Sequence, residues 1–180
     1  MRKREGRLPG WRNKRGAFSI SNVANGRFRI EVSGLPADVY LTSARYGGTE
    51  ILDSGIDIDG SSQGSLDLYF GGTGSVGTLE GVVKGRSDQP AGNSVVVIAP
   101  APNRRGNPTL FRTLVTDQAG LFSVHGLLPG EYTVFAWEDG DAGTYENPEL
   151  LRDFESRGVK ATVERGSRNH VDVRIISNSE

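Results

Sequence analysis

Residues 120–134 read GLFSVHGLLPGEYTV, and the same pattern occurs earlier in the chain as GAFSISNVANGRFRI at residues 16–30. The two copies align without a gap. Each has a turn glycine, an alternating stretch that contains a phenylalanine, an apolar residue (Val23 or Leu127), a tight turn and a second alternating stretch. An internal repeat at domain-sized spacing indicates one unit built twice. We interpret this unit as a β-hairpin whose role is structural rather than catalytic.

Composition favours an all-β fold. The 180 residues include 25 glycines and 8 prolines, which separate short apolar runs, and stretches with helical periodicity are nearly absent. Many short strands of this kind are typical of a sandwich or a barrel, and the length has room for two units. The chain has no cysteine, which excludes a disulfide framework and a thiolate metal site.

Positive charge is concentrated at the start of the chain. Residues 1–15 are rich in arginine and lysine, although the formal net charge of the whole chain is −1. We interpret this basic tail as a disordered or out-of-frame extension and expect no nucleic-acid partner; an arm that binds nucleic acid or an anionic surface is the alternative. No apolar run follows the basic residues, so we expect neither a secretory signal nor a transmembrane segment.

The second copy belongs to a unit that we place at residues 78–177. The β-branched run at residues 94–99 predicts a strand that is buried on both faces. Three prolines make residues 100–108 an expected exposed loop. A Greek-key sandwich fits this series of strands, which we expect at residues 78–84, 94–99, 110–116, 121–124, 131–137, 159–163 and 170–176.

One short helix interrupts the strands of this unit. Asn147 is a suitable N-cap, Pro148 suits the first helical position, and Gly158 is a C-terminal stop. The expected apolar face consists of Leu150, Leu151 and Phe154.

The first copy belongs to a less complete unit, which we place at residues 16–70 and join to the second by a Gly-rich linker at residues 71–77. Only the basic tail precedes it, whereas three expected strands precede the second copy. We therefore expect the first unit to lack its opening strands, which leaves unpaired edges and an uncovered apolar face. This predicts that the chain is the C-terminal part of a longer protein, or that its start is misplaced. The strands expected here lie at residues 27–32, 39–46, 50–52 and 65–70.

The second unit resembles the carboxypeptidase regulatory-like domain family. Residues 116–134, TDQAGLFSVHGLLPGEYTV, match the family pattern T-D-x-x-G-x-F-x-[IV]-x-x-L-x-P-G-x-Y-x-[VL] at every position. The resemblance covers residues 76–176, and it reaches residues 16–70 only through the repeat, where Asn25 replaces the usual proline. It implies two tandem transthyretin-like (prealbumin-like) β-sandwich units, a fold also grouped with carbohydrate-binding-like folds.

The residues of this pattern are suited to a structural scaffold. Asp117 caps a turn, and Gly120 and Gly130 supply backbone angles that other residues resist. Phe122 and Tyr132, together with Leu127, are expected to pack between the sheets. The resemblance implies a non-catalytic module of a bacterial secreted, periplasmic or cell-surface protein that gives structural support or presents a ligand. The alternatives are a carbohydrate-binding module, or an accessory domain of a peptidase or an outer-membrane receptor.

Catalytic residues are not predicted. The two histidines, His125 and His170, fall in or beside expected strands, and no Gly-x-Ser-x-Gly turn or metal-binding spacing accompanies them. We interpret both as solvent-facing and expect no cofactor and no metal. An enzyme such as a metal-dependent hydrolase would need a cleft with converging polar groups.

A ligand, if one binds, is expected at the loop that follows residue 136. Trp137 and Tyr145 flank this loop and offer faces on which a sugar ring could stack. Glu138, Asp139 and Asp141 supply carboxylates between them. Each group also has an alternative interpretation. In the first, Trp137 ends a core strand and Tyr145 fixes the loop over the helix. In the second, the carboxylates are solvated, or they collect a calcium ion without the spacing of a specific calcium site. A carbohydrate or a protein is the expected partner.

Overall fold

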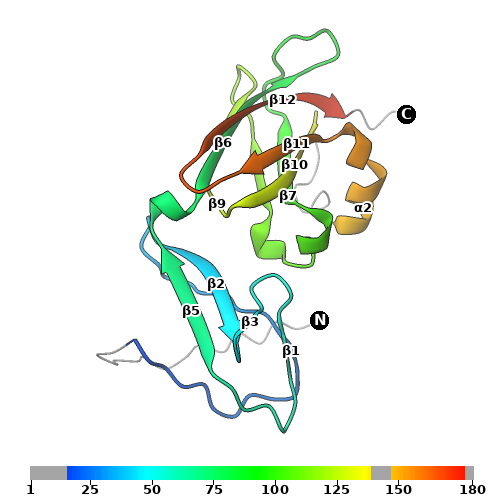
Figure 1. The fold of residues 1–180 in the computed structure, drawn as a ribbon. Coiled ribbons are helices and arrows are strands. Elements are labelled where there is room, and N and C mark those ends of the chain that lie inside the picture. Colours follow the sequence, from blue (N-terminus) through cyan, green and yellow to red (C-terminus); the bar gives the residue numbers. More distant parts are fainter. Residues whose placement is uncertain (1–15, 139–146, 177–180) are drawn as a thin grey trace.

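The computed structural model describes residues 16–138 and 147–176, which form an all-β fold with one short α-helix. Figure 1 shows two parts stacked end to end. We call residues 16–72 the N-terminal part and residues 76–176 the sandwich. A single turn of 3-10 helix, η1 (Thr73–Ser75), connects them within the predicted linker.

Seven strands form the sandwich. β6 (Gly77–Lys84) pairs antiparallel with β9 (Leu121–Leu127) and parallel with β12 (Arg168–Ile176). β10 (Gly130–Trp137) lies between β7 (Val95–Pro100) and β11 (Val159–Val163), and β8 (Arg112–Val115) extends this half beyond β7. The end of β12 also pairs with the end of β10, so one hydrogen-bonded sheet folds over to face itself.

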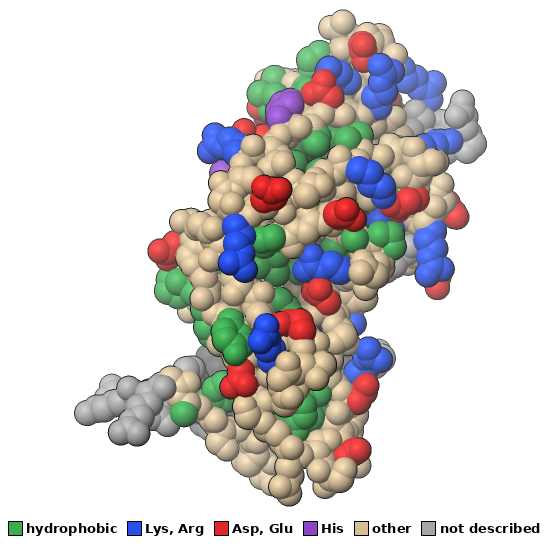
Figure 2. All heavy atoms as spheres, in the orientation of Figure 1, with side chains coloured by type: hydrophobic (Ala, Val, Ile, Leu, Met, Phe, Trp, Pro, Cys, Tyr) green, Lys and Arg blue, Asp and Glu red, His purple; other side chains and the backbone are tan. Residues whose placement is uncertain are grey.

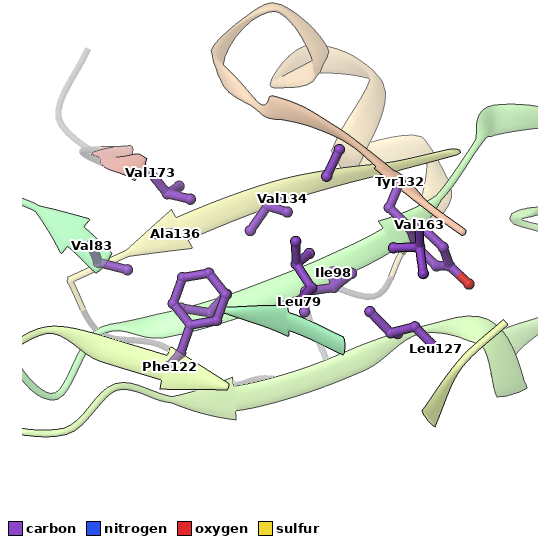
Figure 3. Packing of buried hydrophobic residues seen from close by; sticks show 12 residues of the cluster. Leu79, Val83, Ile98, Phe122, Leu127, Tyr132, Val134, Ala136, Val163 and Val173 are labelled. Carbon is purple, nitrogen blue, oxygen red and sulfur yellow. The ribbon is translucent and has the colours of Figure 1, made fainter. Parts of the chain in front are cut away.

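A hydrophobic core fills the space between the two halves (Figure 3). Tyr132 contributes the largest side chain, and its hydroxyl donates a hydrogen bond of 2.7 Å to the carbonyl of Leu128. This confirms the predicted inter-sheet positions of Phe122, Leu127 and Tyr132. The cluster is completed by Leu79, Val83, Val96, Ile98, Val134, Ala136, Ala161, Val163 and Val173.

A second core covers the other face of β7 and β10. Helix α2 (Pro148–Asp153) and the 3-10 helix η4 (Glu155–Arg157) lie on this face, where Leu151 packs against Phe135 and Trp137. All six residues of β7 are buried, which confirms the prediction that this β-branched run is enclosed on both faces.

The helix begins as predicted but ends for a different reason. The side-chain oxygen of Asn147 accepts a hydrogen bond of 2.9 Å from the backbone N–H of Glu149. Gly158 does follow the last helical turn, yet its φ of −79° is accessible to any residue. A Cβ at Gly158 would collide with the methyl group of Thr133 and the ring of Phe135. Close packing on β10, rather than a left-handed stop, therefore requires this glycine.

The repeat in the sandwich is not a hairpin, which corrects the sequence interpretation. β9 pairs with β6 and β10 pairs with β7, so the two strands of the repeat lie in opposite halves and face each other across the core. The two strands joined by the turn at Asp117 do not form a hairpin either, because β8 pairs with β7 and β9 pairs with β6. Alternation of apolar residues is the same whether two strands are neighbours or face each other, so the pattern does not distinguish these arrangements.

The turn before β9 forms as predicted. The Asp117 carboxylate accepts hydrogen bonds from the backbone N–H groups of Ala119 at 2.9 Å and Leu121 at 2.8 Å. Gly120 has a φ of +74°, and a Cβ there would lie 2.7 Å from the Val83 carbonyl oxygen. Residue 120 is therefore restricted to glycine by conformation and by space.

Two small sheets make up the N-terminal part. β2 (Tyr40–Tyr46) lies between β3 (Thr49–Glu50) and β5 (Leu66–Gly71). β1 (Gly26–Phe28) overlaps the strand predicted at residues 27–32, and it pairs with β4 (Ile56–Ile58), a strand that the sequence analysis did not predict. Residues 16–25 form no strand, so the first copy of the repeat does not form the predicted hairpin either. The tandem organisation of two sandwiches stays a prediction.

Candidate functional site

Trp137 does not form an exposed binding platform. Its side chain is 0% exposed and packs between Phe135, whose ring centre lies at 5.8 Å in a stacked arrangement, and Phe154, whose ring meets it edge-on at 5.8 Å. Helix α2 closes this face of β10. The structural alternative for Trp137, a core residue at the end of a strand, is therefore the correct one.

The rest of the predicted ligand loop is only partly described. Glu138 is exposed directly after β10. Asp139, Asp141 and Tyr145 lie outside the described residues, so their part in a site stays a prediction. Among residues 16–138 and 147–176, no group of three or more acidic, histidine or cysteine side chains is arranged to hold a metal ion.

Both histidines are exposed, as predicted. His125 on β9 lies 3.0 Å from the Thr78 hydroxyl through Nδ1, and His170 on β12 lies 3.2 Å from an Asp172 carboxylate oxygen through Nε2. Figure 2 shows histidine side chains among charged residues on the surface of the sandwich. A hydrogen bond from Lys84 holds the pKa of Asp172 below its usual value, in spite of some desolvation. Thr78 with His125 and Lys84 with Asp172 are cross-strand pairs, whereas His170 and Asp172 lie two residues apart on β12.

The best-formed polar arrangement lies at the junction between the two parts. Arg104, in the 3-10 helix η2 (Pro102–Arg104), contacts both oxygens of Asp53 in the N-terminal part, with Nε–Oδ2 at 2.7 Å and Nη2–Oδ1 at 3.3 Å. The same guanidinium donates to the Pro129 carbonyl at 3.3 Å. A two-pronged arginine–carboxylate pair fixes orientation as well as distance.

Asn107 makes a second contact across the junction. Its side-chain nitrogen donates to the Leu52 carbonyl at 2.8 Å, while its oxygen accepts from the backbone of Thr109 at 3.1 Å and caps the 3-10 helix η3 (Pro108–Leu110). Asn107 is buried, although the sequence predicted an exposed loop here. Pro102 and Pro108 begin short 3-10 helices, which turn polar side chains inward.

Arg105 ties the same loop to the sandwich and is also buried. It donates to the Pro100 carbonyl at 3.0 Å and forms an ion pair of 2.8 Å with Glu155. Glu155 further contacts Lys160 and accepts from the Thr133 hydroxyl. Burial raises the pKa of Glu155, but hydrogen bonds from Lys160 and Arg105 outweigh burial and leave the pKa below its usual value. The loop therefore projects Arg104 and Asn107 from a rigid base.

A cleft of about 200 Å³ opens beside these contacts. Aliphatic side chains from both parts dominate its lining, with Glu31 and Arg112 as its charged residues. Tyr40 of the N-terminal part packs closely on Gly126, where a Cβ would lie 2.6 Å from the tyrosine ring. Sequence reasoning missed the junction and the cleft. The apolar residues of the lining are Ile30, Val32, Leu35, Leu41, Leu52, Leu110, Leu127 and Leu128.

Comparisons with known proteins support no family assignment. No protein-family model matches the sequence, and no curated protein matches it. Three solved structures illustrate the likeness in fold. The minor pilin GBS52 of Streptococcus agalactiae has a TM-score of 0.39 and 17% identity, with 79% of this chain and 61% of that chain covered.

The other two structures are similarly distant. The Bacillus anthracis TIE protein has a TM-score of 0.38 and 14% identity, with 67% of this chain covered, and this chain spans only 20% of that protein. A candidate carbohydrate-binding protein from Pseudomonas aeruginosa has a TM-score of 0.36 and 16% identity, with 56% of this chain and 88% of that chain covered. At such values the likeness carries no argument about ligand, partner or activity. No helix among the described residues is long and apolar enough to span a membrane.

Proposed function

We propose that this chain is a non-catalytic structural module in which the sandwich holds and presents the N-terminal part. The observation that carries the proposal is the pair formed by Arg104 and Asp53 at the junction. Its arginine comes from a loop anchored in the sandwich by the pair of Arg105 and Glu155. A rigid base with an oriented contact is what a supporting module needs.

The family and the setting belong to the same proposal. Support for a carboxypeptidase regulatory-like domain comes from the capped turn at Asp117, the restricted Gly120 and the buried Tyr132, which occupy the family's pattern positions. We place the module in a secreted, periplasmic or cell-surface protein, and we keep the division into residues 16–70, 71–77 and 78–177. Fusion to a peptidase or an outer-membrane receptor is compatible with this role.

Hydrogen exchange of the full chain tests the supporting role. We expect Asp53→Asn to remove the charge pair and to speed exchange at residues 51–55 and 102–107, while β7 and β10 keep their protection. Asp57→Asn, which removes an exposed carboxylate in neighbouring β4, is the matched control and should leave both segments unchanged. Unaltered exchange at residues 51–55 in Asp53→Asn would contradict the proposal.

Carbohydrate binding at the loop after β10 is the second candidate. The observation in its favour is the exposed Glu138 at the end of a fully anchored strand, a usual place for function on a rigid scaffold. Calorimetric titration with a panel of soluble glycans, with and without calcium, separates the two functions. Binding that is lost in Tyr145→Ala would favour the carbohydrate module, and the absence of any heat change or thermal shift would favour the structural one.

A further inference from the structure

The outer edge of β5 carries no strand among residues 16–138 and 147–176. β5 pairs only with β2 and therefore forms one side of its three-stranded sheet. Its six residues, LDLYFG, contain neither proline nor lysine, which commonly protect such edges. Tyr69 and Phe70 are 48% and 47% exposed. Figure 2 also shows hydrophobic side chains at the surface of the N-terminal part. An apolar edge of this length is a template for another strand.

The hydrogen bonds of β5 show which residues point to the open edge. The carbonyl of Ser65 accepts from the Gly47 N–H at 3.0 Å, and the carbonyl of Tyr69 accepts from the Thr42 hydroxyl at 3.1 Å. Odd-numbered residues of β5 therefore direct their backbone groups toward β2. Because these groups alternate along an antiparallel ladder, the even-numbered residues Leu66, Leu68 and Phe70 direct theirs outward.

We propose that the open edge binds a second copy of this chain through antiparallel pairing of the two β5 strands. The two-fold axis passes through Leu68, so that Leu68 lies opposite the Leu68 of the second copy and Leu66 lies opposite its Phe70. In this register the outward-pointing backbone groups of all three even residues find partners. The side chains of these residues share one face, so pairing also brings the exposed Phe70 against an apolar neighbour.

Charge and the length of β5 separate this register from its two neighbours. A shift in one direction places Asp67 opposite the Asp67 of the second copy, which is a destabilising like-charge pair. A shift in the other direction leaves one of the three outward residues without a partner in the opposite β5. In the proposed register Asp67 lies opposite Tyr69 of the second copy. Within its own chain, Asp67 lies opposite Arg45 in the β2–β5 register, and the Arg45 guanidinium is 5.4 Å from the ring centre of Tyr69.

Sedimentation of the full chain over its soluble concentration range tests the dimer. We expect a concentration-dependent species of twice the 19.4 kDa chain mass. Phe70→Lys places a charge against Leu66 of the second copy and should yield the monomer alone. The matched control, Phe28→Lys, changes an exposed aromatic on β1 and should stay dimeric. A monomer at every concentration, or equal loss of the dimer in both variants, would overturn the proposal.

Disulfide trapping tests the register, because the chain has no cysteine of its own. Directly opposite residues that are not hydrogen-bonded to each other have Cα atoms about 4.5 Å apart, within disulfide range. A mixture of the Asp67→Cys chain with the Tyr69→Cys chain should therefore cross-link on mild oxidation, while neither variant should do so alone. Cross-linking of Asp67→Cys with itself would show the shifted register and refute the proposed one.

Discussion

Equivalent positions of the sequence repeat have opposite environments in the two parts of the molecule. Tyr132 is 1% exposed in the sandwich, whereas its counterpart Phe28 in the N-terminal part is 37% exposed. Leu127 is 1% exposed, whereas its counterpart Val23 is 42% exposed. The same pattern of residue types therefore enters a core in one place and stays at the surface in the other.

The difference lies in the strands that surround each copy. β10 has β7 and β11 on its two sides, while β1 pairs with β4 alone in the part of the chain that the structure describes. The local conformation is nevertheless preserved, because the equivalent Gly26 and Gly130 have φ angles of 148° and 151°. The repeat specifies the turn conformation, whereas burial depends on strands supplied by the rest of the chain.

Expressing the two parts separately should show the largest difference between them. We expect residues 75–180, expressed alone, to unfold in one cooperative transition, because the sandwich encloses both hydrophobic cores. Residues 1–74 alone should show no cooperative transition, since only Ala44 and Ile51 are buried apolar residues among 16–74. Circular dichroism during thermal unfolding checks both. A sharp, reversible transition of the first fragment would show that it carries a core of its own.

Truncation at equivalent aromatic positions should give the next largest difference. Tyr132→Ala removes a buried ring and a hydrogen bond, so we expect it to lower the free energy of unfolding by about 3–5 kcal/mol. Phe28→Ala removes a ring that is already partly solvated and should cost less than about 1 kcal/mol. Denaturant titration of the two full-length variants measures the difference. Equal costs would mean that the N-terminal copy is packed as tightly as the sandwich.

Local signals in the sequence predicted the features that depend on a few neighbouring residues. The turn at Asp117 and the N-cap at Asn147 rest on short-range hydrogen bonds, so residue type and spacing were sufficient. The sheet to which β9 and β10 belong was not predictable in the same way, because alternation carries no information about the neighbour. Burial of Trp137 was one of the two alternatives that the sequence left open, because the alternation along β10 does not show which face of the strand helix α2 covers.

The junction escaped prediction for a related reason. Arg104 and Asp53 are 51 positions apart, and each stands in a loop whose sequence is typical of solvent exposure. Charged residues at such positions are usually solvated, so no local pattern marks a specific pair. The structure is needed to show that the two loops meet.

Replacing glycine by alanine should cost more stability at a crowded backbone position in the sandwich than at an open position beside it. Gly158→Ala introduces a Cβ against Thr133 and Phe135, and we expect a loss of about 1–3 kcal/mol in the free energy of unfolding. Gly74→Ala, in η1, meets no atom within 4 Å and should be nearly neutral. Denaturant midpoints of the two variants give the comparison. A neutral Gly158→Ala would show that α2 shifts freely on β10.

Acidification should produce the smallest effect, and it should act through Glu155 in the sandwich. Its pKa in the folded protein lies below the usual glutamate value of about 4.5, so the stabilisation is present above that value and is lost as pH falls through the folded pKa. We expect Glu155→Gln to be less stable than the parent near pH 7 and the gap to narrow below pH 4.5. The partly exposed carboxylate keeps this effect small. Glu131→Gln, an exposed change on β10, controls for the loss of one carboxylate. A gap that stays constant with pH would show that Glu155 acts through packing instead of charge.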